Sequence, residues 1–458
     1  MIGKYKLLRA GLGALSLAFL LSCGGGSDVS GGSVSGHIEG DGFTIGGSSG
    51  GSSNGDGTGG DGGSSGSAST GGDGSTTTAG NGNDDGSGVG SGGTGVSTAD
   101  AGTVGAVDGM GSIIVGGLRY NDDNAVIDRR DADAWQLGMT VAVTGTVDPA
   151  VGTTDPAFET GVAQKLKSMA QMRGAVDSVD VAGGSFQMLG STLSVDDETV
   201  WADLTGLSNV VAGTRVQVWA LPVSPGLLRA TRIESQGVAA TTLATGTVSL
   251  LDDVNKTFQL GSLVVGYASA TLPAEGLAVG RIVRVEASAA PSSGRLEATK
   301  VEGWYALTTV QGAPVQVEGV IDQFVSKGDF KLMGVAIDAS AALVTGGQPD
   351  KLNNGVRVVA SGILSSNGIL VASKVKIRHI PGEGALTRYY DLHGTIEGFQ
   401  SPSNMRVRTA SGGVQRVDVT AALSSASGTG QLQDGQKVRV QGSQVISGVL
   451  QVTQLTYE

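Results

Sequence analysis

The feature that most constrains the fold is a long internal repeat that begins after residue 100. A Gly-x-(Val/Ile) segment occurs five times, at intervals of 69 to 75 residues. Its glycines are Gly105, Gly174, Gly246, Gly319 and Gly394. Solenoid units run to about 20–50 residues, whereas a longer unit can close a small core of its own. The chain is therefore expected to be an array of five small domains.

Three further segments follow each Gly-x-(Val/Ile) segment in the same order. They are a short aromatic or aliphatic strand, a glycine with apolar residues three and five positions later, and a closing strand. In the second repeat these segments are 186–189, Gly213 with Val216 and Val218, and 228–233. The glycine is typical of a turn, and the alternation after it indicates a strand with one buried and one solvated face.

These segments predict an all-β fold, because no long helical period interrupts the strands. Units of about 70 residues with some five strands suit small closed barrels, since closure removes exposed sheet edges. We predict a tandem array of five small OB-like β-barrels, with a small sandwich as the alternative. The repeats are expected at 101–169, 170–238, 242–306, 314–380 and 388–458.

The N-terminus is typical of an export signal. Three basic residues within the first nine precede an apolar run too short to cross a bilayer. The run ends in Leu20-Leu21-Ser22-Cys23, which resembles the lipobox of bacterial lipoproteins. We predict a lipoprotein signal peptide at 1–22 and lipidation of Cys23, the sole cysteine, which would anchor the protein in a membrane. An ordinary secretory signal with an incidental cysteine is the alternative.

Residues 23–100 are dominated by Gly, Ser, Thr and Asp and contain no Lys or Arg. Such a composition cannot bury enough apolar area to offset the chain entropy, so we predict a disordered flexible linker. One island, 36–47, resembles the start of the first repeat. It is either a hairpin or a coincidence in a Gly-rich background.

The first repeat contains Gly105-Ala106-Val107-Asp108 with Ile113-Ile114-Val115, followed by the segment 137–145. These residues resemble a family of bacterial envelope proteins whose repeats are known as domain of unknown function 5666. The resemblance covers residues 101–458. It is strong in the first two repeats and weaker in the third and fifth. It implies an OB-like fold in the cell envelope and supplies no catalytic residues.

Few residues indicate chemistry. The chain has three histidines, His37, His379 and His393. A metal site built on the last two would need a carboxylate such as Glu383 or Asp391, and no spacing is diagnostic. We therefore expect surface histidines at the junction of the fourth and fifth repeats, with no metal and no cofactor.

Acids that recur after the Gly-x-(Val/Ile) segment do not indicate a catalytic pair. They are Asp108, Asp177, Asp322 and Glu397. Because they belong to separate repeats, we expect turn-forming roles rather than paired catalysis. No Gly-x-Ser-x-Gly elbow stands between a strand and a helix. The chain is thus predicted not to be an enzyme.

Candidate ligand contacts fall into two groups. Aromatic pairs at the seams between repeats are Trp304, Tyr305, Tyr389 and Tyr390. Packing between repeats is the favoured role for these rings, with stacking on sugars as the alternative. Arginines on the polar face of the strands are Arg215, Arg284, Arg357 and Arg439, and we expect that face to be solvated.

The net charge of −12 gives no basic footprint for nucleic acid. We predict a lipid-anchored cell-envelope protein, in the outer membrane because Gly24 follows the cysteine. It would act as a structural or multivalent binding array towards envelope polysaccharide or protein, and as a semi-rigid rod. A carbohydrate-binding array is the alternative, and an envelope hydrolase is a remote one.

Overall fold

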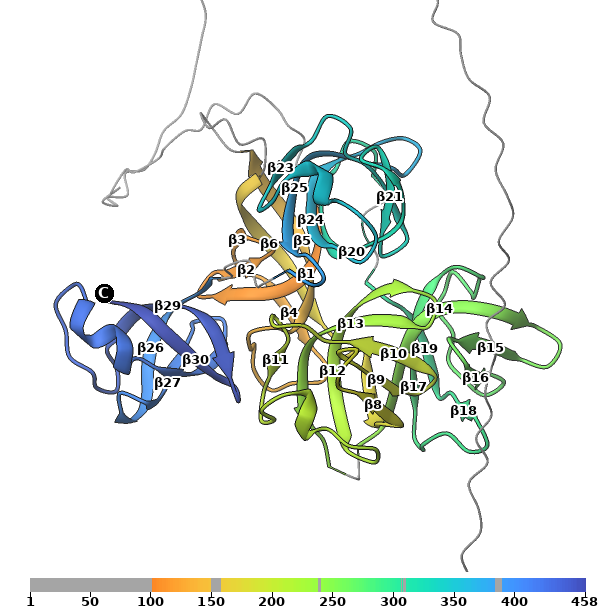
Figure 1. The fold of residues 1–458 in the computed structure, drawn as a ribbon, viewed down its shortest axis with the longest axis horizontal. Coiled ribbons are helices and arrows are strands. Elements are labelled where there is room, and N and C mark those ends of the chain that lie inside the picture. The colour runs from red at the N-terminus through yellow and green to blue at the C-terminus, as the bar shows by residue number, and fades with distance from the viewer. Residues whose placement is uncertain (1–100, 150–157, 238–239, 306, 308–309, 384–388) are drawn as a thin grey trace, which may run out of the picture. The chain divides into compact units, whose positions relative to one another are not determined.

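The computed structural model describes residues 101–149, 158–237, 240–305, 307, 310–383 and 389–458 (Figure 1). The predicted signal peptide, the predicted lipobox with Cys23, the predicted linker and segment 36–47 lie outside these residues. The described part contains thirty β-strands and three short 3-10 helices, so the predicted all-β class is confirmed. None of its helices has the length and apolar character needed to cross a membrane.

The strands repeat in sequence order. The first repeat has β1 (Ala101–Met110), β2 (Ile113–Val115), β3 (Leu118–Asn121), β4 (Val126–Arg129), β5 (Thr140–Pro149) and β6 (Phe158–Ser168). The second has β7 (Met172–Ala175), β8 (Ser178–Asp180), β9 (Ser185–Met188), β10 (Ser191–Ser194), β11 (Val200–Trp201), η1 (Leu207–Asn209), β12 (Arg215–Ser224) and β13 (Leu227–Ser235).

The third repeat has β14 (Thr242–Asp252), β15 (Thr257–Leu260), β16 (Leu263–Gly266), β17 (Ile282–Ala287), β18 (Arg295–Glu297) and β19 (Lys300–Gly303). The fourth has β20 (Pro314–Ser326), β21 (Asp329–Leu332), β22 (Val335–Asp338), β23 (Leu343–Thr345), η2 (Pro349–Lys351), β24 (Arg357–Leu364) and β25 (Leu370–His379). The fifth has β26 (Tyr390–Ser401), β27 (Asn404–Arg408), β28 (Val414–Asp418), η3 (Thr420–Ser425), β29 (Lys437–Ile446) and β30 (Val449–Tyr457).

The first, fourth and fifth repeats each close a ring of five strands. In the first repeat, β1 pairs antiparallel with β2, β2 with β3, β5 with β6, and β1 with β5. Strand β3 pairs parallel with β6 and thereby completes the ring. The fifth repeat has the same order, with the parallel pair formed by β28 and β30. A closed ring leaves no free sheet edge within the unit.

A glycine stands two residues before the same strand of every repeat and makes the same contact each time. The strands are β5, β12, β17, β24 and β29. Gly138, Gly213, Gly280, Gly355 and Gly435 all have φ between 82° and 88°, a region that side chains with a Cβ rarely adopt. In the second repeat, the Gly213 N–H donates to the Val176 carbonyl at 2.8 Å, and the Val176 N–H donates to the Thr214 carbonyl at 2.9 Å. The turn therefore hydrogen-bonds the glycine segment to the Gly-x-(Val/Ile) segment. This explains why both segments recur in every repeat.

Apolar side chains fill the rings and also join them. One buried cluster combines residues of the first and fifth repeats, among them Tyr120, Trp135 and Leu392. A second cluster combines the second and third repeats through residues such as Phe186 and Phe258. The hydrophobic cores are therefore continuous between some repeats, although the rings of the first, fourth and fifth repeats close by themselves.

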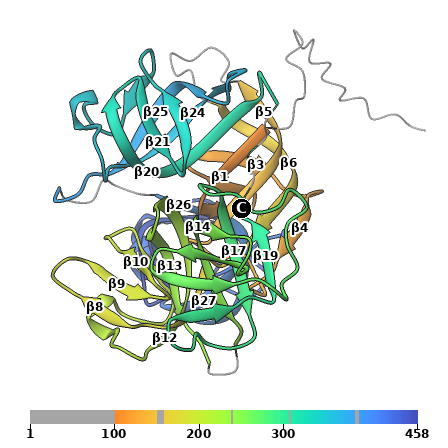
Figure 2. The same ribbon diagram turned by 90° about the vertical axis from the view of Figure 1, so that its right-hand side faces the viewer.

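Strand β1 connects the first repeat to repeats that are distant in sequence. It pairs parallel with β20 of the fourth repeat, from Gly102 opposite Val315 to Val104 opposite Val317 (Figures 1 and 2). Its other end pairs with β26 of the fifth repeat, where Gly109 lies opposite Asp391. The first repeat therefore contacts repeats that are not its neighbours in sequence, which the repeat pattern alone does not indicate. Within its own ring, the stretch 102–104 of β1 pairs only with β5, so its other backbone edge is left to pair with β20.

Candidate functional site

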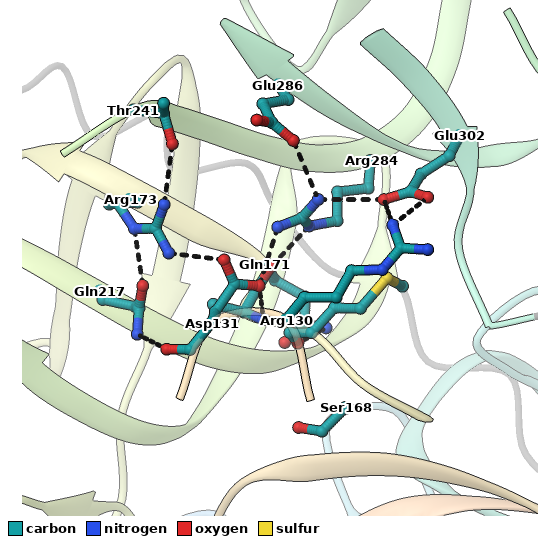
Figure 3. Close-up of polar contacts among 12 residues, drawn as sticks. Arg130, Asp131, Ser168, Gln171, Arg173, Gln217, Thr241, Arg284, Glu286 and Glu302 are labelled. Carbon is teal, nitrogen blue, oxygen red and sulfur yellow. Dashed lines mark hydrogen bonds and ion pairs between the residues drawn. The ribbon is translucent and has the colours of Figure 1, made fainter. Parts of the chain in front are cut away.

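The most unusual feature of the described residues is a set of buried charges between repeats. Asp131 of the first repeat lies at the centre of one such junction (Figure 3). Its Oδ1 is 2.6 Å from Nη2 of Arg173, and its Oδ2 is 2.8 Å from Nη2 of Arg284. The Ala170 N–H also donates to Oδ2 at 3.0 Å. One loop carboxylate thus joins the first, second and third repeats.

Glu302 of the third repeat extends the same junction. It accepts hydrogen bonds from Arg130 Nη1 at 2.5 and 2.7 Å and from Arg284 Nη1 at 3.0 Å (Figure 3). Burial alone would raise the pKa of the Glu302 carboxyl, but Arg130, assisted by Lys300 and Arg284, holds that pKa below its usual value. The carboxylate is therefore charged at neutral pH and neutralises the surrounding cations.

A second junction joins the first, second and fourth repeats. Arg357 is 1% exposed, and its Nη1 lies 2.5 Å from Oε2 of Glu198. Its Nη2 lies 2.5 Å from Oε1 of Glu318, whose other oxygen accepts the Ala106 N–H at 2.7 Å. Charges buried this deeply are tolerated only when they are paired and hydrogen-bonded. This triad therefore requires the three repeats to keep this arrangement.

Two more ion pairs hold the first repeat. Asp108 pairs with Arg378 of the fourth repeat at 3.2 Å. Asp391 of the fifth repeat lies 2.8 Å from Arg119 of the first repeat and 2.7 Å from Arg439. Burial would raise the pKa of Asp391, but Arg439 and Arg119 lower it overall. The predicted turn-forming role is wrong for Asp108, which lies within β1 and is 3% exposed.

The predicted solvated arginine face is wrong for two of its four members. Arg284 and Arg357 are buried in the junctions just described. Arg439 remains 40% exposed while paired with Asp391, and Arg215 is half-buried. Strand alternation identifies a second face correctly, but in this protein another repeat covers part of that face.

The four aromatic residues at the seams also divide into buried and exposed side chains. Trp304 and Tyr305 are buried, and the Tyr305 hydroxyl accepts the Met169 N–H at 2.8 Å and donates to the Thr140 carbonyl at 3.0 Å. This agrees with packing between the third and first repeats. Tyr390 is likewise buried, at 2% exposure, whereas Tyr389 is 62% exposed.

A pocket with a volume of about 390 Å³ lies between the second and third repeats. Asp177 and Arg215 from the second repeat and Thr242 and Ser262 from the third contribute polar groups to its lining. Leu189 and Leu263 supply apolar surface. A pocket with a few polar groups on apolar walls is a usual form for a small-ligand site.

The two C-terminal histidines lie beside carboxylates. His393 Nε2 is 3.6 Å from Asp391, one of the two carboxylates that a metal site would have needed, and its Nδ1 is 3.0 Å from Glu458. His379 lies instead beside Asp196 and Asp197 of the second repeat. Glu383, the other expected helper, pairs with Lys351 at 2.7 Å.

Sequence reasoning did not find the buried acids Asp131, Glu198, Glu302 and Glu318. For Glu318 a pattern was available, since it stands inside an apolar strand between Val317 and Gly319. An ionisable residue in such a position usually has a buried partner. Asp131 lies in a loop and carries no such indication.

A family model described as a domain of unknown function (DUF5666) matches residues 173–234, 245–302 and 318–376. These segments belong to the second, third and fourth repeats. The strong resemblance expected for the first repeat is not part of this match, and the third repeat, expected to be weaker, is matched. No curated protein matches the sequence. The second, third and fourth repeats of the chain therefore match the DUF5666 family.

Proposed function

We propose that the protein is a lipid-anchored component of the bacterial cell envelope that serves as a structural or multivalent binding platform and not as an enzyme. A five-stranded ring with a parallel pair between its third and its last strand fits an OB-like Greek-key barrel. These pairs are β3 with β6 in the first repeat and β28 with β30 in the fifth. The lipobox around Cys23 supports export and lipidation, and Gly24 after it supports the outer membrane.

The observation that carries the platform proposal is the burial of charged pairs between repeats. Asp131, Glu318 and Arg357 are used to hold repeats together. A ligand-binding array benefits from such preorganisation, because sites held at fixed separations engage a polymer without a further loss of chain entropy. The ligands expected are envelope polysaccharide or another envelope protein.

The membrane anchor is tested by Cys23→Ala in the cell that makes the protein. The wild-type chain should partition into the detergent phase in detergent phase separation, and the variant should move to the aqueous phase, because two or more acyl chains supply the anchoring. Ser22→Ala is the matched control, since it leaves the acylated thiol in place. A variant that stays in the detergent phase would exclude lipidation of Cys23.

Carbohydrate binding is the second candidate, and the pocket between the second and third repeats favours it. Its Asp177, Arg215, Thr242 and Ser262 side chains supply the charged and hydroxyl groups that bind sugar hydroxyls. A glycan array probed with wild-type protein and with Arg215→Ala distinguishes the candidates. A glycan that binds the wild type and binds Arg215→Ala more weakly would support a carbohydrate-binding function. The control variant Arg406→Ala, at an exposed position, should keep the wild-type affinity.

A further inference from the structure

Three side-chain atoms that accept hydrogen bonds converge where the second and fourth repeats meet. Asp196 and Asp197 lie in the loop between β10 and β11, and His379 is the last residue of β25. His379 Nδ1 is 3.2 Å from Asp197 Oδ1 and 3.9 Å from Asp196 Oδ2. One ligand atom from each residue lies within 4.8 Å of the other two.

Two of these atoms are buried without a hydrogen-bond partner among the described residues. They are Asp196 Oδ2 and His379 Nδ1. The Asp196 side chain is only 8% exposed, and that of His379 is 15% exposed. A buried acceptor that stays unpaired costs about 1–3 kcal/mol, so native proteins usually place a partner there. A cation between the imidazole nitrogen and the two carboxylates would supply the missing partner for both atoms.

The neighbouring arginines do not fill this role. Arg229 pairs with the other oxygen of Asp196, and Arg357 pairs with Glu198 and Glu318. Of the two aspartates at the cluster, Asp196 pairs with Arg229, whereas Asp197 faces His379 and leaves a negative charge there. A divalent ion at the three-atom cluster would balance this local excess.

We propose that Asp196, Asp197 and His379 bind a divalent cation of the Zn²⁺ class, which joins the second repeat to the fourth. One imidazole nitrogen with two carboxylates suits zinc better than calcium or magnesium, which prefer oxygen ligands alone. Tetrahedral bonds of about 2.0–2.2 Å place zinc ligands about 3.4 Å apart. The 3.2 Å separation of His379 and Asp197 fits one edge, and a small shift of Asp196 completes the face. The fourth position would hold water.

The test uses the full chain stripped of metal with a chelator. Zinc is titrated by calorimetry into the wild type, Asp197→Asn, His379→Gln and the control His393→Gln. Asp197 is 40% exposed, so its substitution removes a ligand with little disturbance of the core. His393 also lies between two acids, which makes it a matched control. Co²⁺ absorption reports the coordination geometry independently.

One high-affinity zinc ion per chain is expected for the wild type and His393→Gln, with affinity at least about tenfold weaker in the other two variants, and zinc should raise the melting temperature of the wild type. Equal zinc affinity in wild type and His379→Gln would overturn the proposal. So would a wild type whose melting temperature does not change when zinc is added.

Discussion

At the scale of single residues, the buried carboxylates decide how the repeats meet. Asp131 contacts two arginines from two other repeats while its side chain is only 7% exposed. Removing one member of such a group leaves an uncompensated buried charge, which costs far more than breaking an exposed pair. The junction is therefore a sensitive point for the stability of the folded part.

Asp131→Asn should lower the free energy of unfolding by about 3 kcal/mol, because Arg173 and Arg284 lose their shared anion. Chemical denaturation of the full chain at neutral pH measures the change. Glu397→Gln, which breaks the exposed pair with Arg408, is the control and should have little effect. Equal losses for the two variants would show that the Asp131 junction contributes no more than a surface pair.

At the scale of the structural element, a glycine turn connects the first strand of each repeat to the strand that follows the turn. All five glycines have the left-handed conformation, and each one donates to a carbonyl in the first strand or, in the second repeat, directly after it. The cost of a Cβ at such a φ arises in the backbone itself and does not depend on neighbouring side chains. This explains why glycine recurs here while the surrounding residues vary.

Gly213→Ala should therefore destabilise the folded chain by about 1 kcal/mol, although no atom lies within 4 Å of the added Cβ. Gly237→Ala is the matched control, since the space around it is equally open and its φ is not left-handed. Thermal denaturation of the two variants separates backbone strain from simple loss of a glycine. If both variants have the same melting temperature, the left-handed φ of Gly213 contributes nothing to the stability of the folded chain.

At the scale of the whole described part, the first repeat is the common neighbour of the fourth and fifth. Strand β1 pairs with β20 along one stretch and with β26 at its other end. Residues that meet across such pairs are far apart in sequence, so their contacts depend on the presence of both repeats. Loss of a terminal repeat should thus affect residues near the start of the folded part.

Deletion of residues 389–458 should increase amide hydrogen exchange at the end of β1, around Gly109 and Met110, by about tenfold or more. The deletion removes both the β26 pairing and the Asp391 partner of Arg119. Hydrogen exchange with mass spectrometry measures this, with the segment 257–266 of the third repeat as an internal control. Unchanged protection at β1 would favour the linear array expected from the sequence.

The sequence by itself determined the local properties of this protein. Its period-two alternation and turn glycines predicted an all-β chain of repeats, since strand alternation and a required φ are set by neighbouring residues. Residues such as Gly213 and Val176 were identified, although not the hydrogen bonds between them. Only the tertiary structure decided which polar faces remain in water. Arg284 and Arg357 have the same alternation as the partly exposed Arg439, yet they are buried because another repeat brings a carboxylate to each of them, Asp131 to Arg284 and Glu198 to Arg357. Such pairing depends on contacts between distant segments, which no local periodicity encodes.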